Sequence, residues 1–176
     1  QIAPVPSSTD IANLRNKIEG ILDARKRSAF KDLLHELIDP VLFEVRDDLS
    51  DRAACIEHMG RGLVDSGFAD RPYIDKVFER EEMSSTAMGA FAMPHTVGLV
   101  GKHSRISVLI SKKPIQWQDT QVNLVLMLCF SPAERSSFNT VFDRVAGSLI
   151  EPANIRRLLE CTSYEAFVDA LASLAN

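Results

Sequence analysis

Near its start, this chain has hydrophobic residues at the spacing typical of a helix. The first apolar set lies three and four residues apart: Ile11, Leu14, Ile18 and Ile21. Ser7 and Asp10 precede this set as a helix start. A second short helix is predicted over residues 29–38, and Pro40 ends it. The first eight residues contain Pro and Ser and are predicted to be a linker. Residues 1–44 as a whole are therefore predicted to be a linker and helical lead-in.

Residues 45–176 alternate between the helical and the extended pattern. Two helices are predicted first, one capped by Ser50 or Asp51 and one over residues 71–82. Three predicted helices close the chain. The first spans 138–150, the second has Pro152 in its first turn, and the third starts at a capping box of Thr162 and Glu165.

Three apolar stretches between these helices predict strands. Residues 88–93 form one, and an alternating stretch from Ile106 to Ile110 forms another, which Pro114 is expected to break. Residues 122–130 are almost continuously apolar, which is typical of a central strand covered on both faces. The predicted fold is therefore an α/β layered domain, with a small mixed central sheet flanked by helices on both faces.

The composition is that of an ordinary soluble globular protein, with 45% apolar and 25% charged residues. A net charge of -4 argues against nucleic-acid contact by this chain. The apolar run 122–130 is too short to cross a bilayer, so no membrane association is expected. Three cysteines without metal or redox spacing predict reduced thiols in a cytoplasmic protein. Because Gln1 stands where Met would be, we expect an excised fragment or a processed product.

One segment carries a recognisable chemistry: residues 80–95 read REEMSSTAMGAFAMPH. This string resembles the signature of the fructose/mannitol type of enzyme IIA domain of the phosphotransferase system. That signature has an Arg-Glu pair, a Ser/Thr pair, glycine, a small apolar strand and then Ala-x-Pro-His. Further matches follow in order, namely Pro-Ile-x-Trp at residues 114–117, a small-Pro-Ala turn at 131–133 and the helical end. The resemblance covers roughly residues 45–176, which we expect to be the enzyme IIA-like domain.

The resemblance implies that His95 accepts a phosphoryl group from the phosphohistidine of the small carrier protein HPr. A neutral imidazole is a nucleophile near pH 7. Arg80 stands at the position of the family's arginine, and its guanidinium suits phosphoryl oxygens. The implied activity is that of a phosphoryl carrier with a phosphohistidine intermediate, and no metal or cofactor is implied. The other reading of His95 is a loop histidine without a role, and that of Arg80 is a cation at a helix C-terminus.

Phe138 marks a departure from the family pattern. Many members have a second histidine here, close to the active histidine, and a phenylalanine cannot bond a phosphoryl oxygen. This difference puts efficient transfer onward to a IIB domain in doubt, while acceptance by His95 stays intact. We expect Arg80 and Phe138 to flank His95 in a shallow depression. His103 follows His95 in the next loop, so it is a weaker candidate for the same site.

Three functions remain open on this evidence. Residues 1–11 weakly resemble the tail of a IIB-like domain in transcription regulators of the antiterminator/mannitol-activator type, in which an enzyme IIA-like domain is C-terminal. The first reading is therefore a regulatory domain of such a sugar-operon regulator. The second is a sugar-transport component that relays phosphate to a IIB domain. The third is an interaction module that no longer carries phosphate, against which the intact Arg80 and His95 argue.

Overall fold

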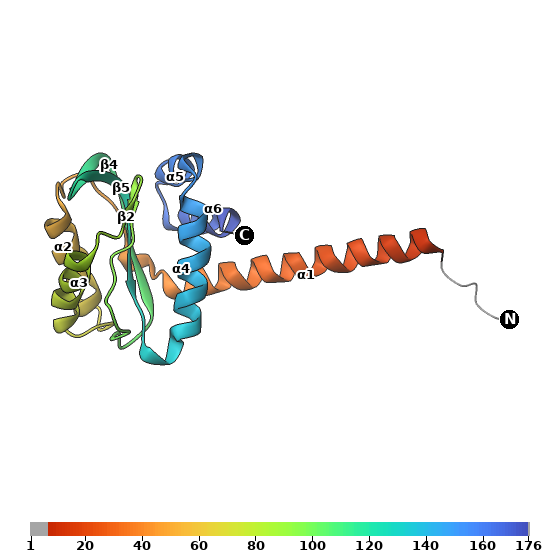
Figure 1. Cartoon of the computed structure of the whole chain (residues 1–176), viewed down its shortest axis with the longest axis horizontal. Helices are drawn as coiled ribbons and strands as arrows, with labels where there is room; N and C mark the ends of the chain where they lie inside the picture. Colours follow the sequence, from red (N-terminus) through yellow and green to blue (C-terminus); the bar gives the residue numbers. More distant parts are fainter. Residues whose placement is uncertain (1–6, 176) are drawn as a thin grey trace.

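The computed structural model describes residues 7–175, which form one layered α/β body and a long helix that projects from it (Figure 1). A mixed five-stranded sheet stands between two helical layers. The predicted fold class is confirmed, because helices cover both faces of the sheet and apolar side chains from both faces are buried.

The sheet has the strand order β1-β4-β5-β3-β2. Its strands are β1 (Phe43–Val45), β2 (Ala87–Met88), β3 (Phe91–Ala92), β4 (Arg105–Trp117) and β5 (Thr120–Cys129). The long β4 and β5 form an antiparallel pair at the centre, while β1 runs parallel to β4 and β3 runs parallel to β5. The predicted central strand at 122–130 is thus confirmed as β5, and most of its side chains are buried.

Each face of the sheet has its own apolar core. The helices α2 (Arg52–Asp65) and α3 (Pro72–Met83) cover one face. The helices α4 (Arg135–Leu149), α5 (Pro152–Leu159) and α6 (Tyr164–Leu174) cover the other, together with the end of α1 (Ser8–Leu37). Neighbouring residues of β4 alternate between the two cores, since Val108 and Ile110 join the second and Leu109 joins the first.

The predicted break at Pro114 is wrong, because β4 continues through it. The pairing with β5 shifts register between Ile110 and Ile115. Proline has no N–H to give to a ladder, so it is tolerated at such an irregularity. The strand therefore bends at Pro114 and resumes, and Trp117 ends up fully buried beneath α3.

Two further local predictions need correction. In place of the single strand predicted over residues 88–93, the chain forms two short antiparallel strands, β2 and β3, and Gly89 adopts a positive φ of 60° in the turn between them. The N-cap of α6 is Ser163, whose side chain accepts a hydrogen bond from the Ala166 N–H, in place of the predicted capping box at Thr162. The predicted cap of α2 is confirmed at Asp51, which accepts from the Ala54 N–H.

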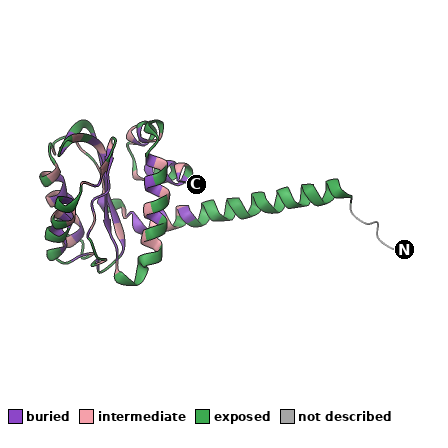
Figure 2. Cartoon of the chain, in the orientation of Figure 1, coloured by how far each residue is buried: buried purple, intermediate pink, exposed green. Residues whose placement is uncertain are grey.

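The lead-in is one continuous helix rather than the two that were predicted. The basic residues at 25–27 and Ser28 lie inside α1, and none of these residue types breaks a helix. Residues 8–29 are exposed throughout, whereas Phe30, Leu34 and Leu37 are buried in the domain core (Figure 2). Only the last turns of α1 therefore pack on the domain. Residues 1–6, part of the predicted linker, lie outside the described residues.

Within residues 7–175, no helix combines the length and the apolar character that crossing a bilayer requires. The cysteines are all free thiols, as expected from their spacing. Burial raises the pKa of Cys55 and of Cys129 to about 12, so both stay protonated and unreactive near neutral pH.

Candidate functional site: a half-buried histidine beside an arginine

His95 lies three residues beyond the end of β3, where the chain still follows β5. The Pro94 carbonyl accepts a hydrogen bond from the Leu128 N–H at 2.9 Å. This bond, together with the fixed φ of proline, holds the backbone just before His95. The imidazole is half-buried. The expected position of His95, at a strand end and partly accessible, is confirmed.

The hydrogen bonding of His95 fixes its tautomer. Its Nδ1 lies 2.8 Å from the Met93 carbonyl oxygen. A carbonyl oxygen can only accept, so Nδ1 carries the proton and donates it. In the neutral ring, Nε2 then holds the lone pair. The backbone of the β3 exit therefore presents Nε2 as the nucleophilic atom of this side chain.

Two aromatic rings of α4 form one wall beside His95. The centroid of the Phe138 ring lies 5.8 Å from the imidazole centroid, and that of Phe142 lies 5.7 Å away. The expectation that Phe138 flanks His95 is confirmed. Phe142 was not among the predicted site residues, although its i+4 spacing from Phe138 on one helix signals a shared face. This wall is apolar and offers no hydrogen-bond donor.

Arg80 approaches the same site from the last turn of α3. Its Nη1 donates to the Ser84 carbonyl at 2.8 Å, which folds the side chain over the turn that follows the helix. Arg80 and His95 line one pocket of about 150 Å³. The other lining residues are Ser85, Thr86, Met88, Met93 and Phe142. The structure thus brings together the predicted site residues Arg80 and His95, in a shallow hollow with a cation beside the histidine.

Glu81 holds the turn beneath this pocket. Its carboxylate is fully buried and accepts hydrogen bonds from the N–H and the hydroxyl of Thr86, each at 2.8 Å, and from the Trp117 indole N–H at 2.7 Å. Glu81 thereby ties the turn to β4, and the Ser85 hydroxyl accepts the Ala87 N–H within that turn. The 84–86 turn is therefore held by the Glu81 carboxylate of α3 together with its own Ser85 and Thr86 side chains.

Burial lowers the pKa of His95, and the positive charge of Arg80 lowers it further. The bond to the Met93 carbonyl and the negative charge of Glu81 act in the opposite direction and are outweighed. Since the neutral form of imidazole is the nucleophile, this balance keeps His95 in its reactive form near pH 7.

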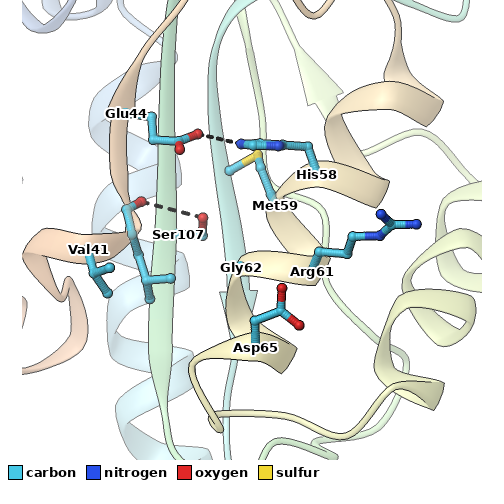
Figure 3. A pocket seen from close by; sticks show the side chains of 9 residues that line it. Val41, Glu44, His58, Met59, Arg61, Gly62, Asp65 and Ser107 are labelled. Atoms are coloured by element: carbon cyan, nitrogen blue, oxygen red, sulfur yellow. Dashed lines mark hydrogen bonds and ion pairs between the residues drawn. The ribbon is translucent and has the colours of Figure 1, made fainter.

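The other described histidines lie away from this pocket. His103 stands edge-on against the Phe68 ring, with centroids 6.3 Å apart, and His35 contacts the Tyr164 hydroxyl at 3.3 Å. His58 lines a different pocket of about 250 Å³ between α2 and β1 (Figure 3). There its Nε2 lies 2.6 Å from the Glu44 carboxylate.

One group among the described residues has three ligand atoms close enough together for a metal ion, all within 4.8 Å: His35, Glu165 and Asp169. Both carboxylates are exposed, and Asp169 already pairs with the Lys31 ammonium at 2.7 Å. The Lys31 charge offsets that of Asp169, so this group has the character of a surface ion pair. No metal site is assigned to these three residues.

Comparison with known proteins identifies this architecture. Residues 36–174 match the family model of the phosphoenolpyruvate-dependent sugar phosphotransferase system, EIIA 2. Because the match covers well over half of the chain, the protein belongs to this family of phosphotransferase-system enzyme IIA domains.

Its relatives include both regulators and transport components. The chain is 34% identical over 154 residues to the probable licABCH operon regulator of Bacillus subtilis, covering 87% of this chain but only 23% of that protein. It is 30% identical over 124 residues to the mannitol-specific phosphotransferase enzyme IIA component of Halalkalibacterium halodurans, covering 68% and 83%. The solved complex of enzyme IIAMtl and phosphorylated enzyme IIBMtl from Escherichia coli shares the fold, with 20% identity, a TM-score of 0.62 and coverage of 74% and 93%.

Proposed function

We propose that His95 accepts a phosphoryl group on Nε2 from the phosphohistidine of HPr. The Nε2 lone pair forms the new N–P bond while the N–P bond of the donor breaks, and its electron pair returns to the donor's ring nitrogen. The Nδ1 proton stays on His95, held by the Met93 carbonyl at 2.8 Å. This single contact carries the proposal, because it leaves Nε2 as the nucleophilic nitrogen of His95.

Arg80 supports the transfer through its charge and position. Phosphoryl transfer needs in-line positioning and neutralisation of the oxygens more than covalent machinery. Arg80 lines the pocket with His95, and its guanidinium has more donors than its one bond to the Ser84 carbonyl uses. The rings of Phe138 and Phe142 pack beside the imidazole, with centroids 5.8 Å and 5.7 Å from its own, and reduce its contact with water. A dry wall protects a phosphohistidine from hydrolysis.

The proposed role is regulatory: phosphorylation of His95 reports the state of the phosphotransferase system within a sugar-operon transcription regulator in the cytoplasm. The similarity to the licABCH operon regulator covers more of this chain than the similarity to the mannitol component does. Phe138 supports the same reading, because an apolar ring cannot stabilise a phosphoryl group that leaves for another protein. A phosphoryl group adds roughly two negative charges, enough to change how the domain docks on a neighbour.

A second candidate is a transport component that relays phosphate to a IIB domain. The 30% identity to a mannitol-specific enzyme IIA component favours it. The same His95 and Arg80 would serve, with the IIB domain as acceptor. The structure of the similar E. coli domain in complex with a phosphorylated IIB domain makes a IIB partner reasonable to test.

Incubation with enzyme I, HPr and phosphoenolpyruvate tests the proposal directly. Intact mass measurement should find one added phosphoryl group on the chain and none on the His95→Gln variant. Glutamine keeps a polar side chain of similar reach but has no nucleophilic nitrogen. If the wild-type chain gains no phosphoryl group while remaining folded, it is an interaction module and the proposal fails.

A further inference from the structure

The exposed outer part of α1, residues 8–29, is called the stalk here. An apolar stripe runs along it, and its members are about half exposed, at 59%, 59%, 48%, 48% and 49%: Ile11, Leu14, Ile18, Ile21 and Leu22. The first four follow spacings of three, four and three residues, which are the a and d positions of two heptads. Such a stripe is the seam of a two-stranded coiled coil.

The stalk lacks contacts that would keep it helical on its own. Its 22 residues extend for about 33 Å from the domain. Isolated helices need favourable sequences to persist in water, and their stability in proteins comes mostly from packing of an apolar face. Gly20 weakens this helix further, because glycine has a low helix propensity. No neighbour requires a glycine at this position, since nothing lies within 4 Å of the space that a side chain would fill. A partner along the seam would supply the missing packing.

We propose that this partner is a second copy of the chain, packed in a parallel coiled coil along the stalk. In a parallel pair, the residue at g approaches the residue at e of the following heptad in the other helix. Here Asp10 of each copy approaches Arg15 of the other copy, so two attractive charge pairs form. Both bonds that the Asp10 carboxylate accepts in the cap go to Oδ2, so Oδ1 is not used by the cap.

The charges disfavour the antiparallel alternative. An antiparallel pair that buries all four seam residues sets Ile11 against Ile21 and Leu14 against Ile18. Lys17 then faces Lys17 of the other copy, and Arg15 faces Arg15, which is repulsive. In the parallel pair, the apolar stem of Lys17 covers Leu22 instead. Arg25, at the next a position, would meet its own copy and therefore ends the seam.

The base of the stalk is fixed to the domain. The Arg144 guanidinium lies over the Phe30 ring at 3.6 Å, and the Lys31 ammonium pairs with Asp169 of α6 at 2.7 Å. Because the helix is continuous through this junction, pairing of two stalks would hold two domains at its ends in a defined orientation. Two His95 sites would then belong to one particle.

Sedimentation velocity of the full 176-residue chain tests the proposal. Wild type should sediment as a concentration-dependent dimer, and Leu14→Asp/Ile18→Asp should weaken the dimer by on the order of a hundredfold or more. The matched control Asn13→Asp/Asn16→Asp adds the same charge on the outer face and should still dimerise. Fluorescence of the buried Trp117 confirms that each domain stays folded. A monomer at all concentrations up to about 100 µM, or equal effects of the two double variants, would overturn the proposal.

Cysteine cross-linking tests the orientation, in a Cys161→Ser background that removes the partly exposed thiol. Ile21→Cys should form a disulfide with its own copy under mild oxidation, while Asn16→Cys on the outer face should not. A mixture of Ile11→Cys and Ile21→Cys chains should give little mixed disulfide. Preferential formation of that 11-to-21 disulfide would establish antiparallel pairing and contradict the proposal.

Discussion

Two half-buried histidines of this domain lie beside pockets, yet they differ in what their ring nitrogens contact. The Nε2 of His58 lies 2.6 Å from the Glu44 carboxylate and 2.9 Å from the Arg46 guanidinium, so it is committed to a surface ion-pair cluster. The contact of His95 is instead on Nδ1, to a backbone carbonyl. His58 has the larger pocket, about 250 Å³ against about 150 Å³.

The comparison shows that pocket size is a poor guide to chemistry in this fold. A histidine that accepts a phosphoryl group needs a neutral imidazole in which one nitrogen donates a hydrogen bond and the other keeps a free lone pair. It also needs a nearby cation that does not bind to that second nitrogen. The His95 pocket has these features through Met93 and Arg80. In the His58 pocket the nearby charges, Arg46 and Glu44, bind the nitrogen itself.

The largest expected effect separates the two histidines. His95→Ala should abolish phosphorylation by phospho-HPr, whereas His58→Ala should leave its rate unchanged, because His58 does not contribute to the His95 pocket. The measurement is the rate of phosphoryl incorporation by radiolabel or intact mass. Loss of incorporation in a folded His58→Ala protein would reverse the assignment.

The two carboxylates near these sites should differ strongly in their contribution to stability. Glu81→Ala removes a fully buried acceptor of three hydrogen bonds and leaves the Thr86 and Trp117 donors unpaired, so it should cost about 3 kcal/mol or more of the free energy of unfolding. Glu44→Ala removes a partner of an exposed cluster and should cost under about 1 kcal/mol. Urea unfolding followed by Trp117 fluorescence measures both, and equal costs would contradict the described role of Glu81.

Arginines beside the two pockets offer a matched pair for catalysis. Arg80→Ala should slow phosphorylation by about tenfold to a hundredfold, since a hydrogen bond to a charged group contributes roughly 1.5–3 kcal/mol. Arg61→Ala, in the His58 pocket, removes the same charge and should have no effect. Single-turnover kinetics with phospho-HPr distinguish the two. An Arg80→Ala rate equal to wild type would remove Arg80 from the proposed mechanism.

Phe138→His should change discharge more than charging. The substitution places a hydrogen-bonding ring about 6 Å from the His95 ring, judged by the present centroid separation of 5.8 Å. Transfer from phosphorylated His95 to a IIB domain should accelerate by about tenfold or more per hydrogen bond gained, while acceptance from HPr changes little. Phe142→Leu serves as a control that alters the same wall without a polar group. Efficient discharge by the wild-type chain would favour the transport role over regulation.

The smallest effect concerns pH. Burial and Arg80 lower the pKa of His95 below its ordinary value of about 6.5, so a larger share of the ring is neutral between pH 7 and pH 6 than in an ordinary histidine. The phosphorylation rate should therefore fall less over this range than it would with an ordinary histidine, and Arg80→Ala should raise the pKa. Because the folded pKa is lowered, the stability that His95 contributes is present above the unfolded pKa and is lost as the pH falls toward the folded value. NMR titration of the imidazole would show a pKa at or above 6.5 if this is wrong.

The sequence predicted which residues lie at the candidate site better than it predicted the contacts that support them. The string from Arg80 to His95 placed both residues and, through the later helix, Phe138. The Glu81 contact with Trp117 was missed because it joins residues 36 positions apart, through a strand whose course past Pro114 depends on a register shift. Local pattern carries no information on such pairings.

The lead-in shows the opposite limit. Periodicity found the apolar residues of α1 but divided the helix at its basic stretch, where no helix-breaking residue occurs. It also could not show that burial begins only at Phe30, because exposed and buried apolar stripes have the same spacing. The expected domain boundary at residue 45 stays a prediction. A chain that starts at Val45 would test this boundary, and a chain that starts at Ser28, which keeps the buried Phe30 and Leu34, is its control.

The most direct test of the central claim is the position of the phosphoryl group on the charged protein. The chain labelled with ¹⁵N is phosphorylated by enzyme I, HPr and phosphoenolpyruvate, and imidazole nitrogens are observed by NMR. The account predicts one phosphohistidine, at Nε2 of His95, with Nδ1 still protonated and donating its hydrogen bond to the Met93 carbonyl. Phosphorylation at Nδ1 of His95, or on His58 or another histidine, would contradict it.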